Sequence, residues 1–335
     1  MSYLRKYNGK IKLNYFQVGI GSIILTGLVL PLIIKNNYLI HLVFMSLLFG
    51  VLAVSLNFAI GYCGLANLAH GTFFGLGAYV TALLALNFST PFYVNLILGG
   101  LFASIFGILL GIPTLRLKGV FLALVSIGFT QIIRIIQLNW VELTRGPMGL
   151  PGIPAAKILN FQFTIVAYCY YILFLLIITL TISWRIKNSK IGRAFFAIKI
   201  DPLAASSIGV NIVYYKILAY VISSFIAGSA GSIYAHYVSF ISPDTFTLND
   251  SITILSMVIL GGAGTIFGPL IGAMFLVLIP ELFRFVDLYR MIFIGSFMVV
   301  GVILNDGTPG DFLKLKLQNL KQQVSAYFSK GSESL

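Results

Sequence analysis

Side chains suited to catalysis are few in this sequence and form no catalytic motif. His41, His70 and His236 are the only histidines, and none begins the His-Glu-x-x-His pattern that holds zinc in metalloproteases. The phosphate-binding pattern Gly-x-x-x-x-Gly-Lys-[Ser/Thr] is also absent from the sequence. We therefore expect no hydrolytic or ATPase site, no metal site and no cofactor bound by this chain.

The positions of the charged residues do not favour an ion-coupled carrier. Such a carrier needs ionisable side chains within its spans, because it holds its coupling ion at membrane depth. None of the acidic residues lies in the middle of a long apolar run. The 9 acidic residues are Glu142, Asp201, Asp244, Asp250, Glu281, Asp287, Asp306, Asp311 and Glu333. Arg134 lies near the end of an apolar run, and we expect it to be an interfacial anchor or a residue at the rim of a passage.

Four polar residues in or beside apolar runs are candidates for the lining of a passage: Asn57, Asn67, His70 and Gln131. Two glycine-interrupted segments, 61–77 and 261–272, are further candidates, because broken helix at membrane depth is tolerated inside protein or along a cavity. In the second segment the glycines concerned are Gly261, Gly262 and Gly264. The alternative for these glycines is close helix packing through small residues.

A short helix with both ends marked is predicted over residues 201–209. Asp201 can cap its free amides, Pro202 suits its first position, and Gly209 can take the left-handed conformation that ends it. Small side chains, including Ala204 and Ala205, would let this helix seat in a groove of another protein. A bulky residue at Ala205 is expected to obstruct such docking. The alternative is a plain connector between two spans.

The composition places these elements in a lipid bilayer. Hydrophobic residues make up 59% of the 335 residues and charged residues 9%, and the mean hydropathy is +0.98. A span needs roughly 20 apolar residues. The predicted spans are 16–34, 39–60, 71–87, 94–112, 119–138, 164–184, 212–237 and 288–304. Cys63 and Cys169 lie in or beside these runs and are expected to be buried hydrophobes rather than a disulfide.

Residues 251–281 form an apolar run that is too long for one upright helix. Glycines interrupt it, so we interpret it as two short spans joined by a glycine hairpin. The sequence thus predicts an all-α, polytopic membrane protein of about ten helices. It would form one transmembrane domain over 1–310, with a loop at 185–211 and a basic tail at 311–335.

The 22 lysines and arginines indicate the orientation of the chain. They gather in the two tails and in a few short connections that fall on one side, which the positive-inside rule makes cytoplasmic. Both termini and the 185–211 loop are therefore expected inside, and 139–163 outside, as a plain loop or a dock for a soluble partner. A nucleic-acid site would need a basic stripe on a folded surface, and none is predicted.

The helix at 201–209 has an Ala-Ala-x-x-x-Gly core, and with it the chain resembles the LivM-type permeases of branched-chain amino acid ABC importers. Six patches resemble this family in the family's order and cover most of the chain between residues 60 and 285. They are GYCGLANLAHGTFFGLGAY (61–79), LRLKGVFLALVSIGFTQIIR (115–134), LTRGPMGLPGIP (143–154), SKIGRAFFAIKIDPLAASSIGV (189–210), AGSAGSIYAHYVSFISPDTF (227–246) and MVILGGAGTIFGPLIGA (257–273).

The resemblance implies a multi-pass subunit of the inner cell membrane that works with partners. These are two ATP-binding subunits that hydrolyse the ATP, a second related permease and an extracytoplasmic substrate-binding protein. In that family the loop helix engages the ATPase, and the implied substrates are branched-chain, hydrophobic amino acids. A permease for urea or short amides is the alternative inside the family. An ATP-independent channel or a secondary carrier is the alternative outside it.

Overall fold

The structure is a computed structural model. It describes residues 36–115, 117, 119–158 and 161–282, with Gly19, Gly21, Gly27 and Gly295 besides. Apart from these single glycines, the predicted spans 16–34 and 288–304, both termini and the tail 311–335 lie outside the described residues.

Six described helices are long and apolar enough to cross a membrane, as the sequence predicts for this part of the chain. They are α2 (Asn37–Asn57) with the π-helical turn η1 (Phe58–Tyr62), α3 (His70–Phe88), α4 (Phe92–Thr114), α5 (Val120–Asn139), α7 (Ile165–Lys187) and α10 (Ile212–Val238). Their ends agree closely with the predicted spans. The largest difference is at α7, which ends at Lys187 rather than at 184.

The predicted break in the apolar run 251–281 is confirmed. The run folds as α11 (Leu248–Gly261) and α12 (Gly268–Leu282), which pack against each other. A Cβ on Gly261 would lie 1.9 Å from the carbonyl oxygen of Gly268, and one on Gly272 would lie 2.1 Å from that of Met257. The two helices therefore run antiparallel and touch through their backbones.

Helix α10 lies at the centre of the bundle and packs most extensively on α4 and α3. Small residues make this contact. A Cβ on Gly77 would lie 2.1 Å from the carbonyl oxygen of Gly228, and one on Gly231 would lie 2.1 Å from that of Phe74. Helices without side chains between them approach closely enough for backbone contact, which is a common way to pack helices in lipid. For Gly77, this confirms the packing alternative.

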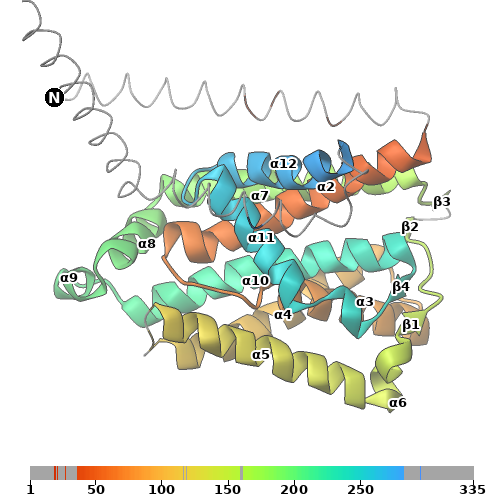
Figure 1. Cartoon of the computed structure of the whole chain (residues 1–335), viewed down its shortest axis with the longest axis horizontal. Helices are drawn as coiled ribbons and strands as arrows, with labels where there is room; N and C mark the ends of the chain where they lie inside the picture. The colour runs from red at the N-terminus through yellow and green to blue at the C-terminus, as the bar shows by residue number, and fades with distance from the viewer. Residues whose placement is uncertain are drawn as a thin grey trace, which may run out of the picture.

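Short elements gather at the two ends of the bundle (Figure 1). At one end lie α6 (Val141–Thr144), the 3-10 turns η2 (Gly146–Met148) and η3 (Pro243–Thr245), and the strands β1 (Leu150–Pro151), β2 (Lys157–Ile158), β3 (Phe161–Gln162) and β4 (Phe240–Ile241). Strand β1 pairs with β4 and β2 with β3, both antiparallel. At the other end lie α8 (Lys190–Ile200) and α9 (Pro202–Ser207). The described chain is thus mainly helical, with these two-residue strands and a few irregular connections besides.

Candidate functional site

Asn57, the last residue of α2, holds the turn between α11 and α12. Its side chain is fully buried. The Oδ1 atom accepts a hydrogen bond from the amide of Gly264 at 2.8 Å, and Nδ2 donates to the carbonyl of Thr265 at 2.8 Å. Both polar ends of the amide are therefore used to join two segments that lie about two hundred residues apart in sequence.

The glycines of this turn are required by its backbone. Gly262 and Gly264 have φ angles of +96° and +90°, a region that side chains with a Cβ rarely adopt. Gly261 touches Gly268 through its backbone, as described above. The structure thus brings three of the predicted passage residues, Asn57, Gly262 and Gly264, to one place where two helices end.

Two lysines that the sequence analysis used only for orientation also reach this place. Lys199, in the last turn of α8, donates from Nζ to the carbonyl of Gly61 at 2.9 Å. Lys187, the last residue of α7, donates to the carbonyl of Gly264 at 2.7 Å and lies 5.9 Å from the centre of the Tyr62 ring. Carbonyls at helix ends lack intrahelical donors and carry partial negative charge, so an ammonium group suits them.

His70 begins α3 and joins three helices. It is fully buried, its Nε2 lies 2.8 Å from the hydroxyl of Ser55 in α2, and its Nδ1 lies 3.5 Å from that of Ser223 in α10. Asn67 is also fully buried, in the irregular segment before α3. Its Oδ1 accepts from the amide of Ala69, and its Nδ2 has no hydrogen-bond partner among the described residues.

The N-terminal turns of α3 and α11 meet next to His70. The amide of Gly71 donates to the hydroxyl of Ser251 at 2.9 Å. Gln131, in contrast, lies on the exposed face of α5. The predicted passage residues therefore divide into those inside this subunit and one on its surface.

The helix predicted at 201–209 is present as α9, and its caps are as expected. The Asp201 carboxylate accepts from the amides of Leu203 at 2.8 Å and Ala204 at 3.3 Å. Pro202 is the first helical residue, and Gly209 has a φ angle of +84°. Asp201 also caps the C-terminal end of α8, so the two helices share one capping residue.

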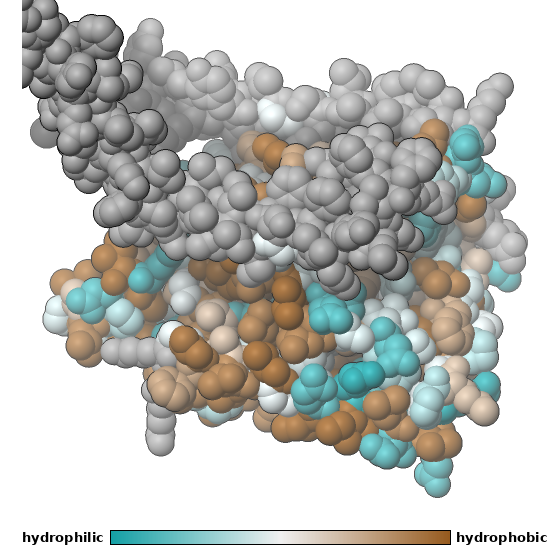
Figure 2. Space-filling model, in the orientation of Figure 1, coloured by the Kyte–Doolittle hydropathy of each residue, from teal (hydrophilic) through white to brown (hydrophobic). Residues whose placement is uncertain are grey.

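The outward face of α9 differs from the expected one. Ala205 is 2% exposed, so its side chain packs inside this chain. Instead Ile200, Leu203 and Ile208 are 84%, 70% and 76% exposed. That a bulky side chain at Ala205 obstructs docking stays a prediction. Hydrophobic residues are visible at this end of the molecule in Figure 2. A six-residue helix between two connections has no periodicity from which the buried side could be predicted.

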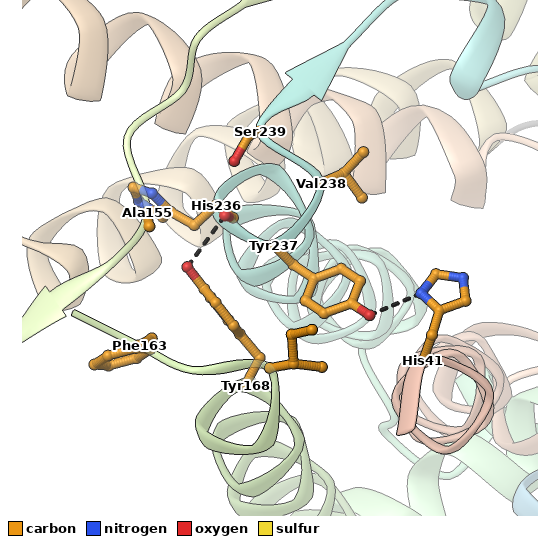
Figure 3. Close-up of a pocket in the computed structure, with 9 residues that line it drawn as sticks. His41, Ala155, Phe163, Tyr168, His236, Tyr237, Val238 and Ser239 are labelled. Carbon is orange, nitrogen blue, oxygen red and sulfur yellow. Dashed lines mark hydrogen bonds between the residues drawn. The ribbon is translucent and has the colours of Figure 1, made fainter. Parts of the chain in front are cut away.

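At the opposite end, an aromatic cavity of 390 Å³ lies among α2, α7 and α10 (Figure 3). The Tyr237 hydroxyl lies 2.7 Å from Nδ1 of His41. The Tyr168 hydroxyl donates to the carbonyl of His236 at 3.1 Å and accepts from the amide of Ala156 at 2.8 Å. These bonds join the ends of α2, α7 and α10, and the bond to Ala156 attaches the segment between α6 and α7 to them.

His236 fixes the same segment from α10. Its Nδ1 lies 2.8 Å from the carbonyl oxygen of Pro154, and because a carbonyl only accepts, Nδ1 must carry the proton. The lone pair on Nε2 then accepts from Nδ2 of Asn95 at 3.2 Å. The neutral ring is thereby held in one tautomer as a structural bridge, so it is not available as a catalytic base.

Arg134 forms an ion pair with Asp244 that joins α5 to η3. The distance between Nη2 of Arg134 and Oδ1 of Asp244 is 2.7 Å, and the two side chains are 37% and 68% exposed. Among the described residues, no group of three or more potential metal ligands occurs. The two cysteines, Cys63 and Cys169, are free and buried, as the sequence predicts.

Comparison with known proteins identifies the family to which this chain is similar. Residues 38–302 match the family model described as "Branched-chain amino acid transport system / permease component". The chain is 34% identical over 283 residues to the high-affinity branched-chain amino acid transport system permease protein LivM of Salmonella typhimurium, covering 77% of this chain and 67% of that protein. It is 32% identical over 314 residues to LivM of Escherichia coli, covering 87% and 73%.

A weaker similarity covers about half of the chain. The autoinducer 2 import system permease protein LsrC of Photorhabdus laumondii is 29% identical over 168 residues, which is 48% of this chain and 49% of that protein. No solved structure matches. On the family match and the two long alignments, the chain belongs to the family of branched-chain amino acid transport system permease components, and it is a multi-pass membrane subunit of a transport system rather than an enzyme.

Proposed function

We propose that this chain is the transmembrane subunit of an ABC importer that moves branched-chain, hydrophobic amino acids delivered by an extracytoplasmic binding protein. The observation that carries the proposal is the similarity to two LivM permeases, at 34% and 32% identity over most of the chain. Permeases of this family work with partner subunits. Here the partners would be two ATP-binding subunits, which hydrolyse the ATP, and a second related permease.

The exposed face of α9 is the proposed contact with the ATPase. Leu203 and Ile208 present two large aliphatic side chains to the outside, while Asp201 and Gly209 hold the helix at its ends. An exposed cluster of this kind on a rigid protrusion suits insertion into a groove of another protein. Because α9 shares Asp201 with α8, displacement of α9 would move α8 with it.

The exposed face of α5 is the proposed contact with the second permease. Of the six candidate spans, α5 is the least buried, with 28% of an apolar 18-residue stretch buried inside this chain. Gln131 is exposed on it, and a Cβ on Gly128 would meet nothing within 4 Å. An amide facing lipid lacks hydrogen-bond partners, which is costly in hydrocarbon. A second subunit, or a water-filled passage between the two, would supply them.

The proposed topology has ten helices, with α11 and α12 crossing as a pair and the predicted spans 16–34 and 288–304, which lie outside the described residues, completing the count. The 185–211 loop and both termini would be cytoplasmic and 139–163 outside, within one permease domain of residues 1–310 and a cytoplasmic tail. The separation of α8 and α9 from β1–β4, at opposite ends of the bundle, supports this orientation (Figure 1). A cysteine replacing Lys157 should react with an impermeant maleimide from outside the cell.

Transport in proteoliposomes tests the proposal. The chain is co-reconstituted with ATP-binding subunits and a second permease subunit of the proposed importer, and with its binding protein. We expect ATP-dependent uptake of labelled leucine, isoleucine and valine. Uptake of urea instead would favour the alternative substrate class. Uptake by this chain alone, without ATP, would overturn the importer and indicate a channel.

A further inference from the structure

One cluster of contacts joins the ends of α2, α7 and α8 to the α11–α12 turn. We call this cluster the lysine latch. It consists of Lys187, Lys199, Asn57, Gly61 and Gly264. Every contact in it joins a side chain to a backbone group at a helix end or turn. We infer that the two lysines are positioning residues for transport, which hold the cytoplasmic end of the passage closed until movement of α8 and α9 withdraws Lys199. This inference rests on the proposed function.

The convergence of the two lysines on one point is the first support. Lys187 binds the carbonyl of Gly264. An ideal Cβ on Gly264 would lie 3.1 Å from the Gly61 oxygen and 3.9 Å from Nζ of Lys199. Both ammonium groups therefore lie beside the same pair of glycines, although they come from different helices.

The fit of the Lys199 stem is the second support. Gly64 follows η1 with a φ angle of +72°, and a Cβ there would lie 3.0 Å from Cγ of Lys199 and 3.4 Å from its Cα. The lysine stem thus lies directly on the chain where α2 has ended. Movement of α8 must change this contact, because no side chain lies between the two backbones.

The distribution of strong and weak contacts is the third support. Asn57 attaches the α11–α12 turn to α2 through two bonds within the buried interior. The lysine bonds are made by long, flexible side chains at one end of the bundle, and Lys199 is an exposed residue. When α8 is displaced, the lysine bonds would therefore break before the Asn57 bonds. The end of α2 and the α11–α12 turn would then separate from α8 while staying joined to each other.

A native reporter lies beside the latch. Cys63 is 2% exposed, between Tyr62 and Gly64. Burial raises the pKa of its thiol to about 12, with a smaller opposing effect from Lys216. A closed latch should keep this thiol unreactive, and an open one should admit a thiol reagent from the cytoplasm.

The first experiment measures maleimide labelling of Cys63 in inside-out vesicles that contain this chain in a Cys169→Ala background. Lys199→Met is expected to raise the labelling rate by about fivefold or more, the range of ordinary conformational coupling. Lys199→Arg, which keeps a donor and a charge, should restore slow labelling. Lys190→Met, at the exposed start of the same helix, is the matched control. A Lys199→Met rate equal to that of Lys190→Met would overturn the latch.

The second experiment measures ATP hydrolysed per leucine transported in the reconstituted importer. Lys199→Met should raise this ratio, because leucine that has been taken up can leak back through a passage that no longer closes, whereas loss of a residue that only stabilises the fold would lower both rates together. If Lys199→Met does not purify as a monodisperse protein, Lys199→Gln is used with the same two outcomes. The labelling experiment needs no partner subunit or substrate, so failure of the latch and failure of the proposed function are distinguished.

Discussion

The two ends of the bundle are held by different kinds of contact. At the end with β1–β4, aromatic rings and a bridging histidine join three helices. The ring centres of Phe44 and Tyr237 lie 3.8 Å apart in a stack, and those of Phe92 and His236 lie 5.6 Å apart. At the end with α9, lysine ammonium groups hold backbone carbonyls. Aromatic side chains have few rotatable bonds and bury large areas, whereas a lysine can release its partner and find water.

This difference matches two different tasks. An end held by aromatic packing keeps its shape, which is what the docking of a soluble binding protein would need. An end held by lysines can change its shape with little loss of buried apolar area, which is what transmission from an ATPase would need. Substitutions at the aromatic end should therefore change stability, and those at the lysine end should change coupling.

The largest effect is expected for His236→Ala. The substitution leaves the Pro154 carbonyl and Nδ2 of Asn95 without their partner and removes the ring that packs on Phe92. Loss of these two hydrogen bonds and of the buried ring, which leaves a small cavity, should cost about 3 kcal/mol of stability. Thermal unfolding in detergent measures this cost. Tyr237→Phe is the milder comparison, since it removes one hydrogen bond, to His41. Faster labelling of Cys63 in His236→Ala would contradict the separation of the two ends.

Leu203→Asp should have the next largest effect, on partner binding rather than on stability. Leu203 is 70% exposed and is the large aliphatic residue of α9. Loss of an anchor in an interface costs about 2 kcal/mol. We therefore expect a clear fall in co-purification of the ATP-binding subunits and an unchanged unfolding temperature. Ser207→Asp, which adds the same charge at an exposed polar position, is the control. Equal loss in both variants would assign the effect to charge alone.

Asp201→Ala removes the side chain that caps α9. N-cap loss costs about 1 kcal/mol, and here the cap belongs to a residue shared by two helices. We expect weaker stimulation of ATP hydrolysis by the loaded binding protein while uptake is retained in part. Asp201→Asn keeps the acceptor and should behave as wild type. If Asp201→Asn is as impaired as Asp201→Ala, the carboxylate has a role other than capping.

The smallest effect is expected for Arg134→Gln. The ion pair with Asp244 is partly exposed to solvent, and surface pairs contribute little. Membrane insertion and assembly should be preserved, as measured by the yield of folded protein, with Arg134→Lys as the control. Failure of the glutamine variant to insert would show that this residue is more than an interfacial anchor.

The spans and the caps of α9 could be predicted because their causes are local. A run of apolar residues has to cross the bilayer wherever it occurs, so α10 was predicted within one residue at each end. Asp201, Pro202 and Gly209 each impose their own backbone geometry. The break between α11 and α12 followed from Gly261 to Gly264 in the same way.

The latch and the aromatic end could not be predicted, because their contacts join distant parts of the chain. Lys199 and Gly61 are separated by 138 positions, and His41 and Tyr237 by 196. The basic residues near helix ends were a signal, but it served equally well for orientation in the membrane. The burial of Ala205 depends on how α9 folds back on its own chain, which its composition does not determine.

The π-helical turn η1 limits how the sequence can vary in length. A π-turn holds one residue more than an α-helical turn, so it acts as a single-residue insertion at the end of α2. Deleting Ile60 would let α2 continue as a regular helix and would rotate the following residues by about 100°. The Gly61 carbonyl would then turn away from Lys199. In evolutionary terms, this segment should accept exchanges of side chains more readily than the gain or loss of one residue.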